Sequence, residues 1–282
     1  MRAPIEEEAA AVRVLAHRLG LGSVTPVLLK AAHHSIFRIS PHPTVVRVQS
    51  AYPSAHALSV ARLELAVARH LADLGAPTVA QADPAVAGPH LLGRCTITLW
   101  PYVDHGSRPE RDDAAAAAQA LRAIHQSLAS FAGALPPFTE SLAKCGRLLA
   151  DPLGMPELSA EDRAFLQARF RQLTEKLDAI DIVSVPLHGD THLGNILWTA
   201  DGPLWGDLES VCTGPVEWDL SALPPTVRAL FPEADTLLID LLADIREVCV
   251  AVWCWAEPSR SSEVRSAAEY HLSRLRVPQA QS

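Results

Sequence analysis

Two carboxylates and a carboxamide stand close together in the segment that runs from residue 185 to 211. Asp190 comes five residues before Asn195, and Asp207 follows twelve residues after it. Phosphoryl transfer from a nucleotide needs one carboxylate to orient the attacking hydroxyl, and a carboxamide and a second carboxylate to hold Mg²⁺. The spacing therefore predicts Asp190 as the catalytic base and Asn195 and Asp207 as metal ligands. Glu209 either reaches a second metal or only braces the loop.

The residues around these groups resemble a known family. Segment 188–195 reads His-Gly-Asp-Thr-His-Leu-Gly-Asn and resembles the catalytic loop of the aminoglycoside phosphotransferase family of small-molecule kinases. Segment 206–209, Gly-Asp-Leu-Glu, together with 214–215 and 218–220, looks like that family's metal-binding segment and the turn after it. Asp219, in the last of these, is expected to fix the loop rather than touch substrate.

The resemblance extends more weakly from about residue 27 to about residue 223. It implies an α+β, two-lobed, protein-kinase-like fold. Residues 1–100 would form a small N-terminal lobe with an antiparallel sheet that binds nucleotide. Residues 101–282 would form a larger, mainly helical C-terminal lobe for catalysis and substrate binding.

The resemblance also implies a reaction: transfer of the γ-phosphoryl group of ATP or GTP to a hydroxyl of a small molecule, with Mg²⁺ as cofactor. The motifs do not discriminate among acceptors such as aminoglycosides, choline, homoserine and sugars. One alternative is an inactive kinase-like protein that binds nucleotide or ligand. A less favoured one is a metal-dependent hydrolase built on His188 and His192, because imidazole suits zinc. Only His271 follows downstream, so further hydrolase ligands are missing.

The first hundred residues supply candidates for nucleotide binding. In the predicted third strand, Arg47 stands where the family usually has Lys, and it can contact phosphate bidentately. Glu64 falls in one helical stripe with Val60, Val67 and Leu71. A carboxylate in an apolar stripe is costly unless it is paired. We therefore expect an ion pair between Arg47 and Glu64.

Two more nucleotide contacts are expected from the family's pattern. The turn 31–35, which would cover the phosphates, contains no glycine, so the hydroxyl or backbone of Ser35 is the candidate contact. At the hinge, the carbonyl of Trp100 and the amide of Tyr102 are expected to pair with a purine edge, since Pro101 has no N–H.

Composition narrows the class of protein. The chain has 282 residues, of which 49% are hydrophobic and 20% charged, which is typical of a globular protein. A net charge of −8 argues against a nucleic-acid partner. From residue 200 onward there are 13 Asp and Glu against 6 Arg and no Lys. This balance favours a cationic small substrate; the alternative is that these acids lie on solvated helix faces.

The sequence also bears on location. It has no run of about eighteen apolar residues, so no membrane span is expected. Its N-terminal segment is acidic early, unlike a secretory signal. Five scattered cysteines without metal-ligand spacing indicate reduced thiols, so we expect a cytoplasmic protein. The oligomeric state is left open.

Periodicity and turn residues predict the order of elements. The N-terminal half is expected to contain helices at 5–19 and 54–74 and strands at 27–31, 35–40, 44–49, 79–82 and 95–99. The rest is expected to contain a helix ending near 131, a connector at 135–156, helices at 159–180, 233–255 and 261–275, and a short hairpin after the catalytic loop. Ser159 and Asp162 form a capping-box-like helix start.

Overall fold

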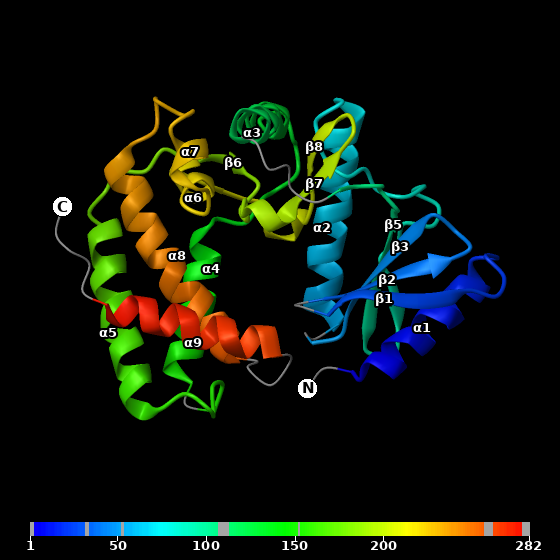
Figure 1. Cartoon of the computed structure of the whole chain (residues 1–282), viewed down its shortest axis with the longest axis horizontal. Coiled ribbons are helices and arrows are strands. Elements are labelled where there is room, and N and C mark those ends of the chain that lie inside the picture. The colour runs from blue at the N-terminus through cyan, green and yellow to red at the C-terminus, as the bar shows by residue number, and fades with distance from the viewer. Residues whose placement is uncertain are drawn as a thin grey trace. The chain divides into compact units, whose positions relative to one another are not determined.

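The computed structural model describes residues 3–31, 34–51, 54–106, 113–151, 153–256 and 262–277 (Figure 1). Contacts divide the chain into two compact units. Unit 1 contains residues 1–133 and 192–211, and unit 2 contains 134–191 and 212–282. This partition by contacts differs from the functional division expected after residue 100, which stays a prediction. Within the described ranges, no helix has the length and apolar character needed to cross a bilayer.

Unit 1 is built on a five-stranded antiparallel sheet with the strand order β1-β2-β3-β5-β4. Alternate residues of its strands, such as Phe37, Val46 and Ile97, are buried and pack with Val12 and Leu15 of the first helix. The sheet core is therefore the apolar face that the period-2 pattern predicts. The elements are α1 (Ile5–Arg18), β1 (Thr25–Ala31), β2 (Ser35–Ser40), β3 (Thr44–Gln49), α2 (Ser54–Asp73), β4 (His90–Leu92), β5 (Cys95–Pro101) and α3 (Ala114–Leu128).

The fourth strand lies elsewhere than the sequence predicts. No strand forms at 79–82; β4 forms a hairpin with β5 through Gly93 and Arg94, and Gly93 has φ +58°. A two-residue turn that contains glycine is a strong hairpin signal. Thr78 instead forms an isolated parallel bridge with Trp205, and Val79 donates its N–H to the carbonyl of Trp205 at 3.3 Å.

A second segment of the chain completes unit 1. It contains η1 (Leu193–Asn195), β7 (Ile196–Thr199), β8 (Gly202–Trp205) and η2 (Leu208–Ser210). The expected hairpin is present as β7 and β8, with Thr199 opposite Gly202. Trp205 is fully buried: its backbone N–H donates to Pro77 O at 2.9 Å, and its ring N–H donates to Ala117 O at 3.4 Å. These contacts fix the point at which the chain enters the segment of Asp207.

Unit 2 is mainly helical and is organised around α8 (Thr236–Ala256), which packs against α4, α5, α6 and α9 (Figure 1). Leu242, Ile245, Val248 and Val252 of α8 are fully buried in the core of this unit. A two-stranded antiparallel sheet pairs β6 with β9, and the segment that begins at His188 follows β6 directly. The elements are α4 (Thr139–Ala150), α5 (Ala160–Leu177), β6 (Val185–Leu187), β9 (Cys212–Gly214), α6 (Val216–Leu220), α7 (Pro225–Arg228), α8 and α9 (Ser262–Arg276).

Helix α4 replaces the connector expected at 135–156. Leu142, Cys145 and Leu149 are buried at i, i+3 and i+7, which is a helical period that the nearby prolines and glycines obscure. The capping box at the start of α5 is confirmed: Asp162 N donates to Ser159 Oγ at 3.0 Å.

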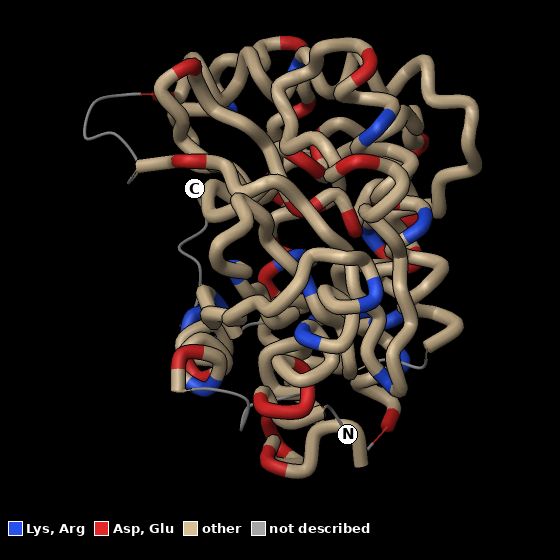
Figure 2. Tube along the Cα trace, turned by 90° about the vertical axis from the view of Figure 1, so that its right-hand side faces the viewer, with Lys and Arg blue, Asp and Glu red and all other residues tan. Residues whose placement is uncertain are grey.

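Acidic and basic residues are interspersed along the chain (Figure 2). Several acids of unit 2 are in ion pairs: Asp244 with Arg169 at 2.7 Å, and Glu247 with Arg274 at 3.7 Å. Surface pairs of this kind neutralise part of the acidic balance after residue 200. A cationic substrate is therefore less strongly indicated than the charge count alone suggests.

We expect Trp205→Ala to lower the free energy of unfolding by about 3–5 kcal/mol, because it empties a fully buried site next to Gly206. Trp205→Phe keeps most of the ring packing and loses only a long hydrogen bond, so it should cost about 1 kcal/mol. Urea unfolding followed by circular dichroism checks both. Equal losses for the two variants would contradict the packing role.

Candidate active site

Arg47 links three segments of unit 1 that are distant in sequence. It lies on β3 opposite Ile36 and Thr98 of the flanking strands. Its Nη2 forms an ion pair with Glu64 on α2, and its Nη1 donates to Asp207 Oδ1 at 2.8 Å. The ion pair that the sequence predicts between Arg47 and Glu64 is present, and it is joined to Asp207, one of the expected metal ligands.

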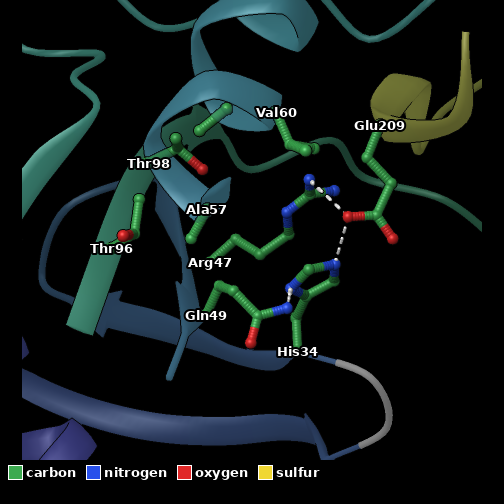
Figure 3. A pocket seen from close by; sticks show the side chains of 9 residues that line it. His34, Arg47, Gln49, Ala57, Val60, Thr96, Thr98 and Glu209 are labelled. Atoms are coloured by element: carbon green, nitrogen blue, oxygen red, sulfur yellow. Dashed lines mark hydrogen bonds and ion pairs between the residues drawn. The ribbon is translucent and has the colours of Figure 1, made fainter. Parts of the chain in front are cut away.

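The guanidinium of Arg47 forms an ion pair with a third carboxylate besides Glu64 and Asp207, because Glu209 Oε2 lies 3.7 Å from Arg47 Nη2 (Figure 3). Burial raises the pKa of Glu64, Arg47 lowers it, and Asp207 and Glu209 raise it. Together these effects bring the pKa of Glu64 to about 8. Burial lowers the pKa of Arg47, but the same three carboxylates raise it by more, so the guanidinium stays charged. The cluster has a surplus of negative charge, which attracts a proton or a further cation.

Asp207 has a left-handed backbone, with φ 61° and ψ 62°. Among the described residues it is the one non-glycine residue with positive φ. Asp and Asn adopt this conformation at lower cost than other side chains, and such residues cluster at functional sites. Gly206 N donates to Asn195 O at 2.8 Å. The backbone therefore holds Asn195, which is buried, next to the partly exposed Asp207.

His34 joins this cluster from the residue before β2 (Figure 3). Its Nε2 lies 2.7 Å from Glu209 Oε2, and its Nδ1 lies 3.3 Å from Gln49 Nε2. Gln49 Oε1 accepts the backbone N–H of Ala51 at 2.8 Å, which turns the amide nitrogen toward His34. Because that nitrogen can only donate, His34 Nδ1 accepts and Nε2 carries the proton that Glu209 accepts.

Sequence reasoning missed His34 and chose Ser35 instead. Ser35 is fully buried as the first residue of β2. His34, Arg47 and Glu209 line a pocket of about 30 Å³, room for one or two waters, that Ser35 does not line. Residues 32 and 33 of the expected phosphate-covering turn lie outside the described residues. A donor side chain in a turn that lacks glycine was the available signal for His34; a phosphate contact by Ser35 stays a prediction.

The chemistry of the donors fits magnesium. His34, Asp207 and Glu209 place their candidate ligand atoms within 4.8 Å of one another. The proton on His34 Nε2 prevents that nitrogen from binding a cation. The remaining donors are the carboxylates of Asp207 and Glu209, and Asn195, held to Gly206 through its backbone carbonyl, is the candidate for a third oxygen. An all-oxygen set suits Mg²⁺ better than Zn²⁺.

The expected hinge residues lie at the end of β5. Trp100 is paired with Val45 of β3, and its Nε1 donates to Thr98 Oγ1 at 2.9 Å. The amide of Tyr102 donates to Pro43 O at 2.8 Å. That amide is thus engaged by the chain itself, and the pairing of Trp100 and Tyr102 with a purine stays a prediction.

In unit 2, one side chain holds the loop that carries Asp190. Asp219 on α6 accepts the backbone N–H of His188 at 2.9 Å and that of Gly189 at 2.7 Å, one on each carboxylate oxygen. The hydroxyl of Thr191 donates to the carbonyl of Asp219. Asp219 is fully buried, so these are charge-assisted bonds in a dry interior. The expected bracing role of Asp219 is confirmed.

His188 and His192 each accept a hydrogen bond from the backbone of the loop. Asp190 N donates to His188 Nδ1 at 3.3 Å, which matches the structural role expected for His188. Gly194 N donates to His192 Nδ1 at 3.1 Å. These contacts give the zinc-hydrolase alternative no support. The side chain of Asp190 itself is 35% exposed, so it can meet a substrate hydroxyl.

Comparison with known proteins gives one family and one fold. Residues 5–253 match the family described as "Phosphotransferase enzyme family". Stress response kinase A of Escherichia coli K12 is 34% identical over 121 residues, which are 33% of this chain and 37% of that kinase. The matched region thus spans little more than a third of this curated relative.

Solved structures extend the likeness over nearly the whole chain. Choline kinase LicA from Streptococcus pneumoniae aligns with a TM-score of 0.65 at 15% identity and covers 94% of this chain and 99% of its own. A thermostable mutant of aminoglycoside phosphotransferase APH(4)-Ia, in complex with AMP-PNP and hygromycin B, aligns with a TM-score of 0.63 at 13% identity and covers 96% and 100%. The expected α+β, kinase-like fold is confirmed.

The raised pKa of Glu64 predicts a pH effect on stability. Burial brings the pKa of Glu64 to about 8 in the folded chain, against 4.5 for an ordinary glutamate. The folded state therefore binds more protons in this window, and stability should fall as pH rises from 5 to 8. Glu64→Gln stays neutral and should flatten that fall by at least about 1.4 kcal/mol, the equivalent of one pKa unit. Urea unfolding between pH 5 and 8.5 measures it.

Glu7→Gln, at an exposed position on α1, is the matched control and should keep the wild-type slope. If Glu64→Gln shows the wild-type slope as well, Glu64 is ionised throughout this range.

Proposed function

The chain belongs to the phosphotransferase enzyme family, and on that premise we propose that it is a small-molecule kinase. It transfers the γ-phosphoryl group of ATP or GTP to a substrate hydroxyl. The observation that carries this proposal is the convergence on Arg47 of a helix carboxylate, Glu64, and of Asp207 after β8. A strand cation, a helix glutamate and a metal-binding aspartate are the parts with which kinases hold a nucleotide triphosphate.

In this proposal, Arg47 contacts the phosphates of the nucleotide and Glu64 keeps its guanidinium in place. Arg47 presents two N–H directions, which suits phosphate oxygens. Asn195 and Asp207 would hold Mg²⁺, with Glu209 nearby. When bound, Mg²⁺ neutralises charge on the phosphates. Arg47 donates to Oδ1 of Asp207, and the second carboxylate oxygen would serve the metal.

Asp190 aligns the acceptor hydroxyl and receives its proton. In a loose transition state the hydroxyl needs its proton removed only late, so a carboxylate held in the right place is sufficient. Asp219 supplies that placement through the two backbone N–H groups before Asp190. Catalysis here rests on orientation more than on basicity.

The acceptor is proposed only as a class, a small molecule with an alcohol group. The structural neighbours named above include a choline kinase and an aminoglycoside phosphotransferase. A panel of choline, aminoglycosides, homoserine and sugars, assayed for Mg²⁺-dependent consumption of ATP and GTP, would define both substrates. We place the reaction in the cytoplasm, because all five cysteines are free thiols, as a reducing compartment requires.

One alternative has an observation in its favour. Arg47 is bonded to Asp207, and an Arg in this position could keep the metal ligand occupied permanently. The chain would then bind nucleotide or ligand without turnover. Thermal shifts with ATP, with and without Mg²⁺, separate the two readings. A shift that requires Mg²⁺, together with slow ATP hydrolysis, supports the kinase, whereas a shift by ATP that Mg²⁺ does not change supports the binding protein.

We expect Asp190→Ala to lower phosphoryl transfer at least about 10³-fold, because the hydroxyl loses both its alignment and its proton acceptor. The dissociation constant for Mg·ADP should not change, since Arg47 and Asp207 are intact. Turnover assays and calorimetric titration measure the two quantities. Asp178→Ala, at an exposed position just after α5, is the matched control and should retain wild-type turnover. Survival of turnover in Asp190→Ala would show that another group is the base.

A further inference from the structure

Arg246 is a buried cation on α8, a helix whose core-facing side is otherwise apolar. It is 8% exposed, and Leu242 and Cys249, one turn away on either side, are fully buried. Burial lowers the pKa of Arg246, and the carboxylates of Asp190 and Asp219 oppose that effect. A guanidinium is stable in such a place only when its N–H groups have partners. The hydrogen-bond partners of Arg246 therefore indicate its role in the structure.

Those partners belong to the catalytic loop and to the turn that supports it. Nη2 donates to Trp218 O at 2.8 Å and to Gly189 O at 3.3 Å, and Nε donates to Ser221 Oγ at 3.0 Å. The guanidinium carbon lies 3.9 Å above the centre of the Trp218 ring. Gly189 O also accepts the ring N–H of Trp218 at 3.2 Å. With its plane held by a ring and its edge by three acceptors, the guanidinium cannot rotate freely.

The other terminal nitrogen faces the proposed base. Arg246 Nη1 lies 3.7 Å from Asp190 Oδ1, too long for a hydrogen bond but close enough for a strong attraction between charges. The two residues are 56 positions apart, and both lie in unit 2. A cation that is itself immobile thus attracts one oxygen of the Asp190 carboxylate.

We propose that Arg246 is a positioning residue for phosphoryl transfer: it fixes the rotamer of Asp190 by its charge and the carbonyl of Gly189 by a hydrogen bond. This inference rests on the proposed function, because it takes Asp190 as the base. In this proposal Arg246 acts through Asp190 and not by contact with the phosphates or the acceptor. The signal in the sequence is a lone arginine on the apolar side of a helix, but its partners lie too far away in the chain to be recognised there.

A second arginine of unit 2 offers a matched control. Arg228 binds the same turn, with Nη2 donating to Ser221 O at 2.7 Å and Nε donating to Leu223 O at 2.6 Å. Its ion-pair partner is Asp240, at 3.7 Å. Arg228 therefore shares the structural task of Arg246 at the turn but makes its ion pair away from Asp190.

The test uses the full chain with Mg·ATP as substrate and water as acceptor. Arg246→Met should lower kcat for ATP hydrolysis about 10²-fold, the size of effect that a misplacement of about 1 Å can produce. KM for ATP and the dissociation constant for Mg·ADP should not change. Arg246→Lys, which keeps the charge but not the planar fork, should lie between Met and wild type. Arg228→Met should lower Tm but leave kcat near the wild-type value.

A double variant tests whether Arg246 acts through Asp190. Asp190→Asn and Asp190→Asn/Arg246→Met should hydrolyse ATP at the same rate, because the second change removes support from a group that is already disabled. A further drop in the double variant, or a wild-type kcat in Arg246→Met, would overturn the inference. If Arg246→Met does not fold, Arg246→Lys carries the test: a lowered kcat at unchanged KM supports the inference, and an unchanged kcat overturns it.

Failure of the proposed function gives a different pattern. If Asp190→Asn alone hydrolyses ATP at the wild-type rate, the base assignment is wrong, whatever Arg246→Met does. If Asp190→Asn is slow and Arg246→Met is normal, only the positioning role of Arg246 is lost.

Discussion

A single, largely buried guanidinium shared by three carboxylates organises unit 1. Removing a charge from water is costly. The charged side chain of Arg47 is tolerated on the central strand β3 because Glu64, Asp207 and Glu209 surround it. Those carboxylates come from a helix and from a segment about 160 residues further along the chain. The sheet, α2 and the segment after β8 must therefore pack around one point, and that point carries the nucleotide chemistry we propose.

Unit 2 is also organised by a buried charged group, but here the group is a carboxylate. Here a buried carboxylate, Asp219, accepts two backbone N–H groups of the loop, and a buried guanidinium, Arg246, binds the carbonyl of Gly189 from the other side. The backbone before Asp190 is thus fixed through both its donors and its acceptor. A loop held in this way needs little reorganisation when substrate arrives, which is the main source of rate in phosphoryl transfer.

Local signals in the sequence were sufficient for much of this arrangement. The spacing of Asp190, Asn195 and Asp207 predicted the candidate site, and a carboxylate in an apolar helical stripe predicted the ion pair of Glu64 with Arg47. The prediction was wrong at β4, where the local Gly93-Arg94 turn pairs 90–92 with β5, and at α4, whose helical period the nearby prolines and glycines obscure. His34 and Arg246 were missed for a different reason, because their partners are brought to them only by the fold.

The left-handed backbone at position 207 limits what can stand there. Most side chains would clash with their own carbonyl in this conformation, at a cost of roughly 1–2 kcal/mol. Asparagine tolerates it as well as aspartate does and has nearly the same shape. Exchanging one oxygen for an amide nitrogen would thus change the charge at the proposed metal site while the chain path is preserved. Position 207 is therefore the natural place to make a stalled form of the protein, one suited to capturing nucleotide and acceptor together in a crystal.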